Sequence, residues 1–244
     1  MDETLLKTVS AVTVGRKVSA VRSYWQWLQS HEIISPDRNP FEGRTIKDNR
    51  TKVEQALAKR QRFDTADVVK LWKAAAGDRP LHALIRPAAF TGARREGLAS
   101  LQINLVVKVD GVDCPRLQEK TEAGIRTVPI HPEIATLVAD LAKNSTDGFL
   151  IQSETDKYGH RGDALRKRFT KLKTDLKFDK LHTFHSLRHT VVHLFREAEC
   201  PVEIRNQILG HEVGDTGAGS GYGGHVGEKL KLEWLTKAVR YPSK

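Results

Sequence analysis

The apolar positions near the start of the chain recur at steps of four and three. They are Val14, Val18, Val21, Trp25 and Leu28. This spacing places them along one side of a helix, so we predict an amphipathic helix in this part of the chain. A Pro-containing segment, 35–40, follows, and it should end the helix because Pro disfavours the helical conformation of the residue before it.

Polar and basic residues dominate the next segment, 43–62. We interpret it as an interdomain linker containing a short helix, which separates a partial helical region, 1–42, from the rest of the chain. Both segments carry cations that would suit a phosphate backbone. These candidate DNA contacts are Arg16, Lys17 and Arg22 off the helical stripe, and Lys47, Arg50 and Lys52 in the linker. A solvated basic face explains the three helical cations equally well.

A second domain is predicted over 63–244, and it begins with helical patterns. Thr65 is a suitable N-cap for a helix that carries Val68, Leu71, Trp72 and Ala75 and ends near Gly77. An apolar run, 81–90, leads to Thr91-Gly92 and contains Pro87, which should kink a helix. Another helix is expected after Arg95-Glu96.

Strands are expected only over 103–130. Three valines precede Asp110-Gly111, a dipeptide that favours a tight hairpin turn. A second polar turn, 122–124, separates Leu117 from the run that ends in Pro129, a residue that belongs at a sheet edge or a strand end. We therefore predict a three-stranded antiparallel sheet with Lys120 at its second turn.

The pattern is helical again after residue 131. The predicted helices cover roughly 132–143, 161–175, 186–198, 202–208 and 226–239. The last of them would place Leu230, Leu232, Leu235 and Val239 either against its own domain or against a neighbouring protomer. The fold class predicted from these patterns is α+β, predominantly helical, with one small sheet.

The net charge of the chain narrows the classes of partner that it can bind. The chain has 244 residues and a net charge of +10, from 40 Lys+Arg against 30 Asp+Glu. Lys and Arg bind nucleic acid by displacing counterions from phosphates, so this excess favours a nucleic-acid partner. The two cysteines exclude a disulfide framework, and no segment is apolar enough for a membrane span or a signal peptide. We expect a soluble, cytoplasmic protein.

The most informative residues lie near the C-terminal end. His185-Ser186-Leu187-Arg188-His189 is followed by Leu209-Gly210-His211 and by Tyr222, and upstream Arg94 follows Thr91-Gly92-Ala93. Guanidiniums neutralise a phosphate, imidazoles move protons and a phenol can attack phosphorus. A zinc site on the two histidines four residues apart would need Glu in place of Ser186. The glycines of 214–224 fit a dinucleotide fingerprint formally, but no strand precedes them.

The order of these residues resembles that of the tyrosine recombinases, the phage-integrase-like site-specific DNA recombinases. Lys120-Thr121 before Arg126-Thr127-Val128-Pro129 fits the same pattern, and the resemblance covers about 63–240, extending weakly to 10–42. It implies a catalytic domain at 63–244 and, at 1–42, the last portion of a SAM-like core-binding domain. It also implies cleavage of double-stranded DNA through a covalent 3′-phosphotyrosine, without metal, ATP or another cofactor.

The resemblance assigns a role to each residue of the motif. Arg94 and Arg188 would bind the non-bridging oxygens of the scissile phosphate, and Tyr222 would attack it. His185 would accept or relay the proton, His211 would donate a hydrogen bond to the phosphate, and Lys120 would protonate the leaving 5′-oxygen. Tyr241, Tyr24 and Tyr158 are weaker candidates for the nucleophile because they lie outside the motif.

Two departures from the family pattern leave alternatives open. Gly97 stands where relatives commonly carry a supporting Glu, and the amino-terminal region is short. A DNA-binding protein on a decayed recombinase scaffold is one alternative, and a type IB topoisomerase or telomere resolvase is another. For an active recombinase, we expect a phage or bacterial protein associated with the nucleoid. It would be a homotetramer on DNA and a monomer or weak oligomer in its absence.

Overall fold

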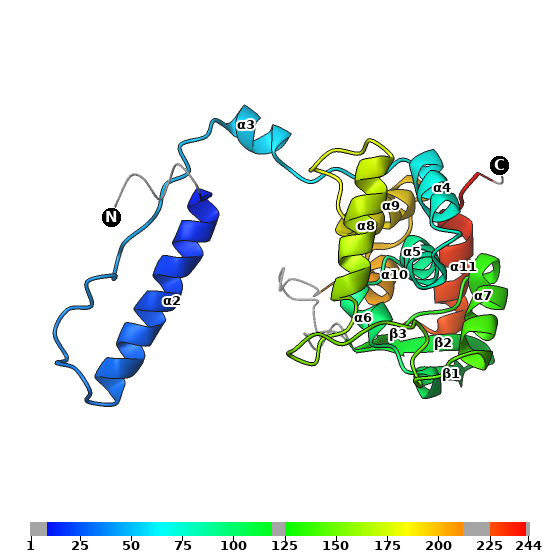
Figure 1. Ribbon diagram of the computed structural model, residues 1–244, viewed down its shortest axis with the longest axis horizontal. Coiled ribbons are helices and arrows are strands. Elements are labelled where there is room, and N and C mark those ends of the chain that lie inside the picture. The colour runs from blue at the N-terminus through cyan, green and yellow to red at the C-terminus, as the bar shows by residue number, and fades with distance from the viewer. Residues whose placement is uncertain (1–8, 119–124, 212–224, 243–244) are drawn as a thin grey trace. The chain divides into compact units, whose positions relative to one another are not determined.

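The computed structural model describes residues 9–118, 125–211 and 225–242. The chain divides into two compact units, Met1–Lys59 and Arg60–Lys244 (Figure 1). In the described ranges the protein is predominantly helical with one small antiparallel sheet, so the predicted fold class is confirmed.

The first unit contains the predicted amphipathic helix. Helix α2 (Ala11–Ser30) begins where the Ser10 hydroxyl accepts a hydrogen bond from the Thr13 backbone N–H, and it buries Val14 and Val18. The short helix expected in the linker is α3 (Lys52–Leu57), which begins with reciprocal Thr51 and Glu54 hydrogen bonds.

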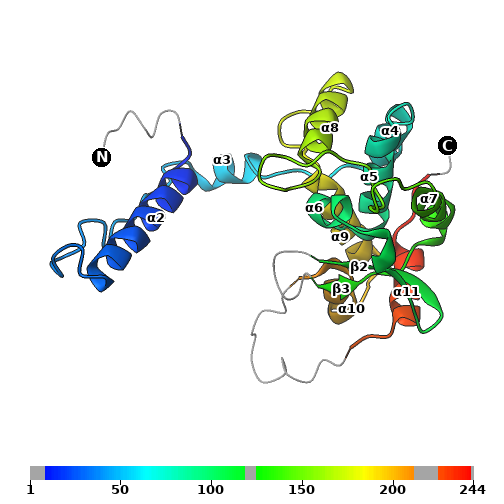
Figure 2. The ribbon, with the colours of Figure 1, turned by 60° about the horizontal axis from the view of Figure 1, so that its bottom comes forward.

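The second unit is built around α5 (Arg79–Thr91), most of whose residues are buried. The helices around it are α4 (Thr65–Ala74), α6 (Arg95–Ala99), α7 (Pro132–Lys143), α8 (Asp163–Asp175) and α9 (His185–Glu197), each in contact with α5 (Figure 2). The helix α10 (Val202–Leu209) packs against α9. Because α5 is buried on most sides, the run 81–90 is apolar except at His82 and Arg86.

Two predicted details of α4 differ from the structure. Thr65 is the first helical residue of α4 rather than its cap, because Asp64 has the extended backbone of an N-cap and its carbonyl accepts the first helical hydrogen bond from Val68 N–H. The same helix ends at Ala74, before Gly77. Pro87, where a kink was predicted, lies inside α5.

The sheet has the order β1-β2-β3, with both pairs antiparallel. Its strands are β1 (Val106–Val109), β2 (Val112–Leu117) and β3 (Arg126–Thr127). Asp110 and Gly111 have φ of 50° and 81°, which is the left-handed pair that a type I′ hairpin requires. Pro129 follows the edge strand β3, as expected. The second turn, with Lys120, lies outside the described residues.

The last helix, α11 (Glu228–Ala238), packs within its own unit. Leu235 is fully buried, whereas Leu230 is 42% exposed. The buried Glu228 carboxylate accepts hydrogen bonds from Thr127 Oγ1 of β3 at 2.6 Å and from Lys231 Nζ at 2.8 Å. A buried carboxylate needs such partners to offset its desolvation, so this contact fixes the start of α11 against the sheet.

Candidate active site

The turn after α5 positions the first candidate arginine. Gly92 ends α5 in the left-handed conformation, and the buried Thr91 hydroxyl donates to Pro87 O and accepts from Ala93 N–H. The chain then becomes extended at Arg94, which is the N-cap residue of α6 and is half-buried. Thr91-Gly92 in the sequence therefore corresponds to a tight turn, and this turn fixes the position from which the Arg94 side chain projects.

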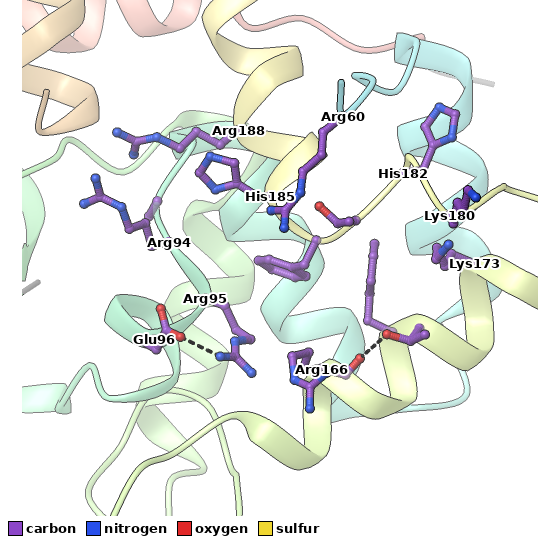
Figure 3. A pocket seen from close by; sticks show the side chains of 15 residues that line it. Arg60, Arg94, Arg95, Glu96, Arg166, Lys173, Lys180, His182, His185 and Arg188 are labelled. Carbon is purple, nitrogen blue, oxygen red and sulfur yellow. Dashed lines mark hydrogen bonds and ion pairs between the residues drawn. The ribbon is translucent and has the colours of Figure 1, made fainter. Parts of the chain in front are cut away.

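The second candidate arginine lies against this same turn. Arg188 is on the first turn of α9 and only 3% exposed, and its Nη1 donates to the Gly92 carbonyl at 2.9 Å. His185 is the first residue of α9, with its ring edge-on to His189 at 4.8 Å between centroids. Figure 3 shows Arg94, Arg188 and His185 grouped on one side of a cavity.

The absence of a side chain at Gly92 allows the close packing around this turn. Replacing Gly92 tests that packing directly. An added Cβ would lie 2.6 Å from Leu209 Cδ2 at a φ of 65°, which side chains rarely adopt. We expect Gly92→Ala to lower the free energy of unfolding by about 2–4 kcal/mol, measured by urea denaturation. Gly148→Ala is the matched control, since Gly148 also has positive φ but open space around it. It should cost only about 1–2 kcal/mol, and equal losses would contradict the packing.

His211 joins the group from α10. It follows Gly210, which ends that helix in the left-handed conformation. Burial, together with the nearby guanidiniums of Arg188 and Arg94, lowers the pKa of His211 to about 4. Burial likewise lowers the pKa of His185 to about 4, with His189, Arg188 and Arg94 among the additional causes. Both imidazoles are therefore neutral at pH 7, beside the same two arginines.

These pKa shifts predict a loss of stability in acid. A histidine in the unfolded chain has a pKa of about 6.5, so the unfolded state gains protons first as the pH falls from about 6.5 towards 4. Stability contributed by neutral His185 is present above that window and lost within it. We expect urea denaturation to show that the free energy of unfolding falls less between pH 7 and pH 5 for His185→Gln than for the parent protein. His160→Gln, at an exposed loop position, should behave like the parent. If His185→Gln lost as much free energy of unfolding as the parent, the buried, neutral state assigned to His185 would be contradicted.

Arg126 is a part of the site for which sequence reasoning gave no role. It is 9% exposed, and its Nε donates to Ile208 O at 2.8 Å, which ties β3 to the end of α10 just before His211. Its positive charge is also one of the causes that lower the pKa of His211. An Arg within a short, otherwise apolar strand run was the available signal.

Two of the six predicted catalytic residues, Lys120 and Tyr222, lie outside the described residues. The other tyrosines differ in environment. Tyr241 donates from its hydroxyl to Ala89 O at 2.7 Å, and burial raises its pKa far above the ordinary value, so it is a poor nucleophile. Tyr158 and Tyr24 are exposed, at 72% and 60%.

The candidate DNA contacts of the first unit fall into two groups. Arg22 donates to the carbonyls of Phe41 and Arg44, so it helps hold the segment after α2 in place. Arg50 forms an ion pair with Asp48 at 2.7 Å. The other four, Arg16, Lys17, Lys47 and Lys52, are exposed.

Within the described ranges, no three His, Cys, Asp or Glu side chains are grouped as metal ligands would be. The helices of those ranges also include none long and apolar enough to cross a bilayer.

Comparison with known structures identifies the fold. A lambda integrase tetramer bound to a Holliday junction matches 88% of this chain with 63% of its own, at 16% identity and a TM-score of 0.65. The Tn1549 transposon integrase in complex with circular intermediate DNA matches 95% of the chain with 77% of its own, at 17% identity and a TM-score of 0.59. The integrase from mycobacterium phage Brujita matches 97% with 76%, at 16% identity and a TM-score of 0.55.

The sequence itself matches the family profile of the phage integrases over residues 61–216. No curated protein matches the chain. The matched range includes Arg94, Lys120, His185, Arg188 and His211, and it ends before Tyr222. Because it spans more than half of the sequence, the chain belongs to the phage integrase family, whose members are tyrosine recombinases.

Proposed function

We propose that this protein is a site-specific recombinase that cuts and rejoins double-stranded DNA through a 3′-phosphotyrosyl intermediate on Tyr222. The observation that carries the proposal is the convergence of Arg94, Arg188, His185 and His211. Arg188 is bonded to the Gly92 turn that precedes Arg94, and the guanidiniums of these two arginines lower the pKa of both imidazoles. Such a concentration of positive charge suits a phosphodiester passing through a more negative transition state.

Each side chain then has a distinct part in the reaction. Arg94 and Arg188 hold the non-bridging oxygens while the Tyr222 oxygen forms a bond to phosphorus and the bond to the 5′-oxygen breaks. His185, neutral at pH 7, accepts the phenolic proton, and His211 donates an N–H to a phosphate oxygen. Lys120 gives its proton to the leaving 5′-oxygen. The bound phosphate raises the pKa of both histidines, since it adds negative charge beside them.

The reverse reaction completes strand exchange. The 5′-hydroxyl of another strand attacks the phosphotyrosine, so a phosphodiester is regenerated and the energy of the broken bond is conserved without ATP. The lambda integrase relative was solved as a tetramer on a Holliday junction. We extend that arrangement to this chain as a proposal, with the first unit contributing further contacts to the DNA backbone.

Covalent trapping tests the function. The protein is incubated with nicked duplexes taken from the DNA that flanks its own gene, and denaturing gels are used to detect a protein–DNA adduct. We expect an adduct, and we expect paired duplexes to exchange strands. Adducts without exchange would favour a topoisomerase or resolvase, whereas saturated binding without an adduct would favour a decayed scaffold that binds DNA only.

A further inference from the structure

The cavity lined by Arg94, His185 and Arg188 extends well beyond these three residues. It has a volume of about 560 Å³, which is more than one phosphate group fills. Phe169 and Phe184 contribute apolar surface to its wall, and many cationic side chains line it. The basic side chains outside the catalytic set are Arg60, Arg95, Arg166, Lys173, Lys180 and His182 (Figure 3).

Most of these additional basic side chains already have partners. Arg95 pairs with Glu96 at 2.5 Å, and Arg166 pairs with Asp163 at 2.8 Å. The buried Lys173 donates to the Asp179 carbonyl, and His182 contacts the Asp179 carboxylate. These groups already bond to the protein, so they add less attraction for an incoming anion.

Arg60 and Lys180 differ from them. Among the described residues, neither has a hydrogen-bond or ion-pair partner, and both side chains are exposed at the cavity. A backbone hydrogen bond from Gln61 N–H to Leu181 O, 3.2 Å long, joins the residues that follow them, so the two segments run side by side. The fully buried Phe63 anchors this region, because its carbonyl accepts from Thr190 of α9 at 2.7 Å.

A hydroxyl lies in the same wall of the cavity. Thr183 Oγ1 is buried and has no hydrogen-bond partner in the described part of the chain. An unsatisfied buried hydroxyl costs stability, so a ligand that reached it would recover a hydrogen bond. Thr183 is also two residues before His185, and both residues line the cavity.

We propose that Arg60, Lys180 and Thr183 form a second phosphate site, which binds a backbone phosphate next to the scissile one. This inference rests on the proposed function, since it assumes that the cleaved strand passes the catalytic arginines. The chemistry is that of the DNA backbone, because the site offers charge and a hydroxyl donor without an arrangement that reads base edges. Arg60 is near enough to the catalytic group that its charge contributes to the lowered pKa of His185.

Salt dependence of binding tests the proposal. Affinity for a nicked duplex is measured from 50 to 200 mM salt for the parent, Arg60→Gln, Lys180→Gln and Thr183→Val. Each charge removed should make the plot of log affinity against log salt shallower by about 0.9. Thr183→Val keeps the slope and weakens binding several-fold. Lys143→Gln is the control, because Lys143 is at an exposed position on α7 that does not line the cavity. It should change neither the affinity nor the slope of its salt dependence.

Duplexes in which one phosphate is replaced by an uncharged group locate the phosphate that Arg60 contacts. In a series of duplexes with one methylphosphonate each, the parent should lose affinity at one position beside the scissile phosphate. Arg60→Gln should be insensitive at that same position. If Arg60→Gln and the parent are equally sensitive at every position, the second site is wrong, even where adducts form. If no adduct forms but the position-specific effect is present, the proposed function fails and the phosphate site stands.

Discussion

Replacing Tyr222 by Phe is expected to abolish the covalent protein–DNA adduct while leaving DNA affinity within about two-fold of the parent. The substitution removes only the phenolic oxygen that we propose as the nucleophile. The buried Tyr241 hydroxyl is already engaged with Ala89 O, and its pKa is raised by burial. A denaturing gel on nicked duplexes, together with a filter-binding titration, measures both quantities.

Matched tyrosine variants give this prediction its control. Tyr158→Phe changes an exposed side chain in the same unit, and Tyr24→Phe changes one in the first unit. Both should form the adduct at the parental rate. Normal adduct yield from Tyr222→Phe, or complete loss in Tyr158→Phe, would show that Tyr222 is not the nucleophile.

Arg188→Ala should slow cleavage by about a thousand-fold or more at saturating DNA, because a guanidinium on the developing phosphate charge is removed. Single-turnover cleavage on a nicked duplex measures the rate. The substitution also leaves the Gly92 carbonyl without its partner and opens space in the core, so stability must be measured alongside. A cleavage rate within ten-fold of the parent would place the scissile phosphate elsewhere.

Arg94→Ala separates chemistry from folding. Arg94 is only half-buried at the start of α6, so its loss should disturb the core less than that of Arg188. We expect a rate loss of about a hundred-fold or more with a nearly parental free energy of unfolding. A variant that is stable, binds DNA and cleaves normally would remove Arg94 from the proposed phosphate clamp.

Local patterns in the sequence were sufficient for most of the elements. The steps of three and four predicted α2, and Asp110-Gly111 predicted a hairpin whose two positive φ angles the structure contains. The details that differed concern helix ends. Capping depends on the backbone of a single residue, so Asp64 and Thr65 could not be separated by pattern alone.

The candidate site was predicted as a set of residues rather than as a geometry. The motif order identified Arg94, His185, Arg188 and His211, but their convergence depends on contacts across the fold, such as Arg188 with Gly92. The lowered pKa of both histidines arises from burial, which no local pattern reports.

Other parts of the site were beyond the reach of sequence reasoning. Arg126 reaches the carbonyl of Ile208, far along the chain, and Arg60 was one cation among many in a basic linker. Only the fold places Arg60 beside Lys180 at the cavity. The roles of Lys120 and Tyr222 remain predictions from the motif, since both lie outside the described residues.

Mass spectrometry of the trapped adduct tests the central claim most directly. The protein is incubated with a nicked duplex, the adduct is digested with nuclease and protease, and the modified peptide is sequenced. We predict a peptide in which the Tyr222 oxygen carries a nucleotide through its 3′-phosphate. A nucleotide on any other residue, or attachment through a 5′-phosphate, would contradict the account.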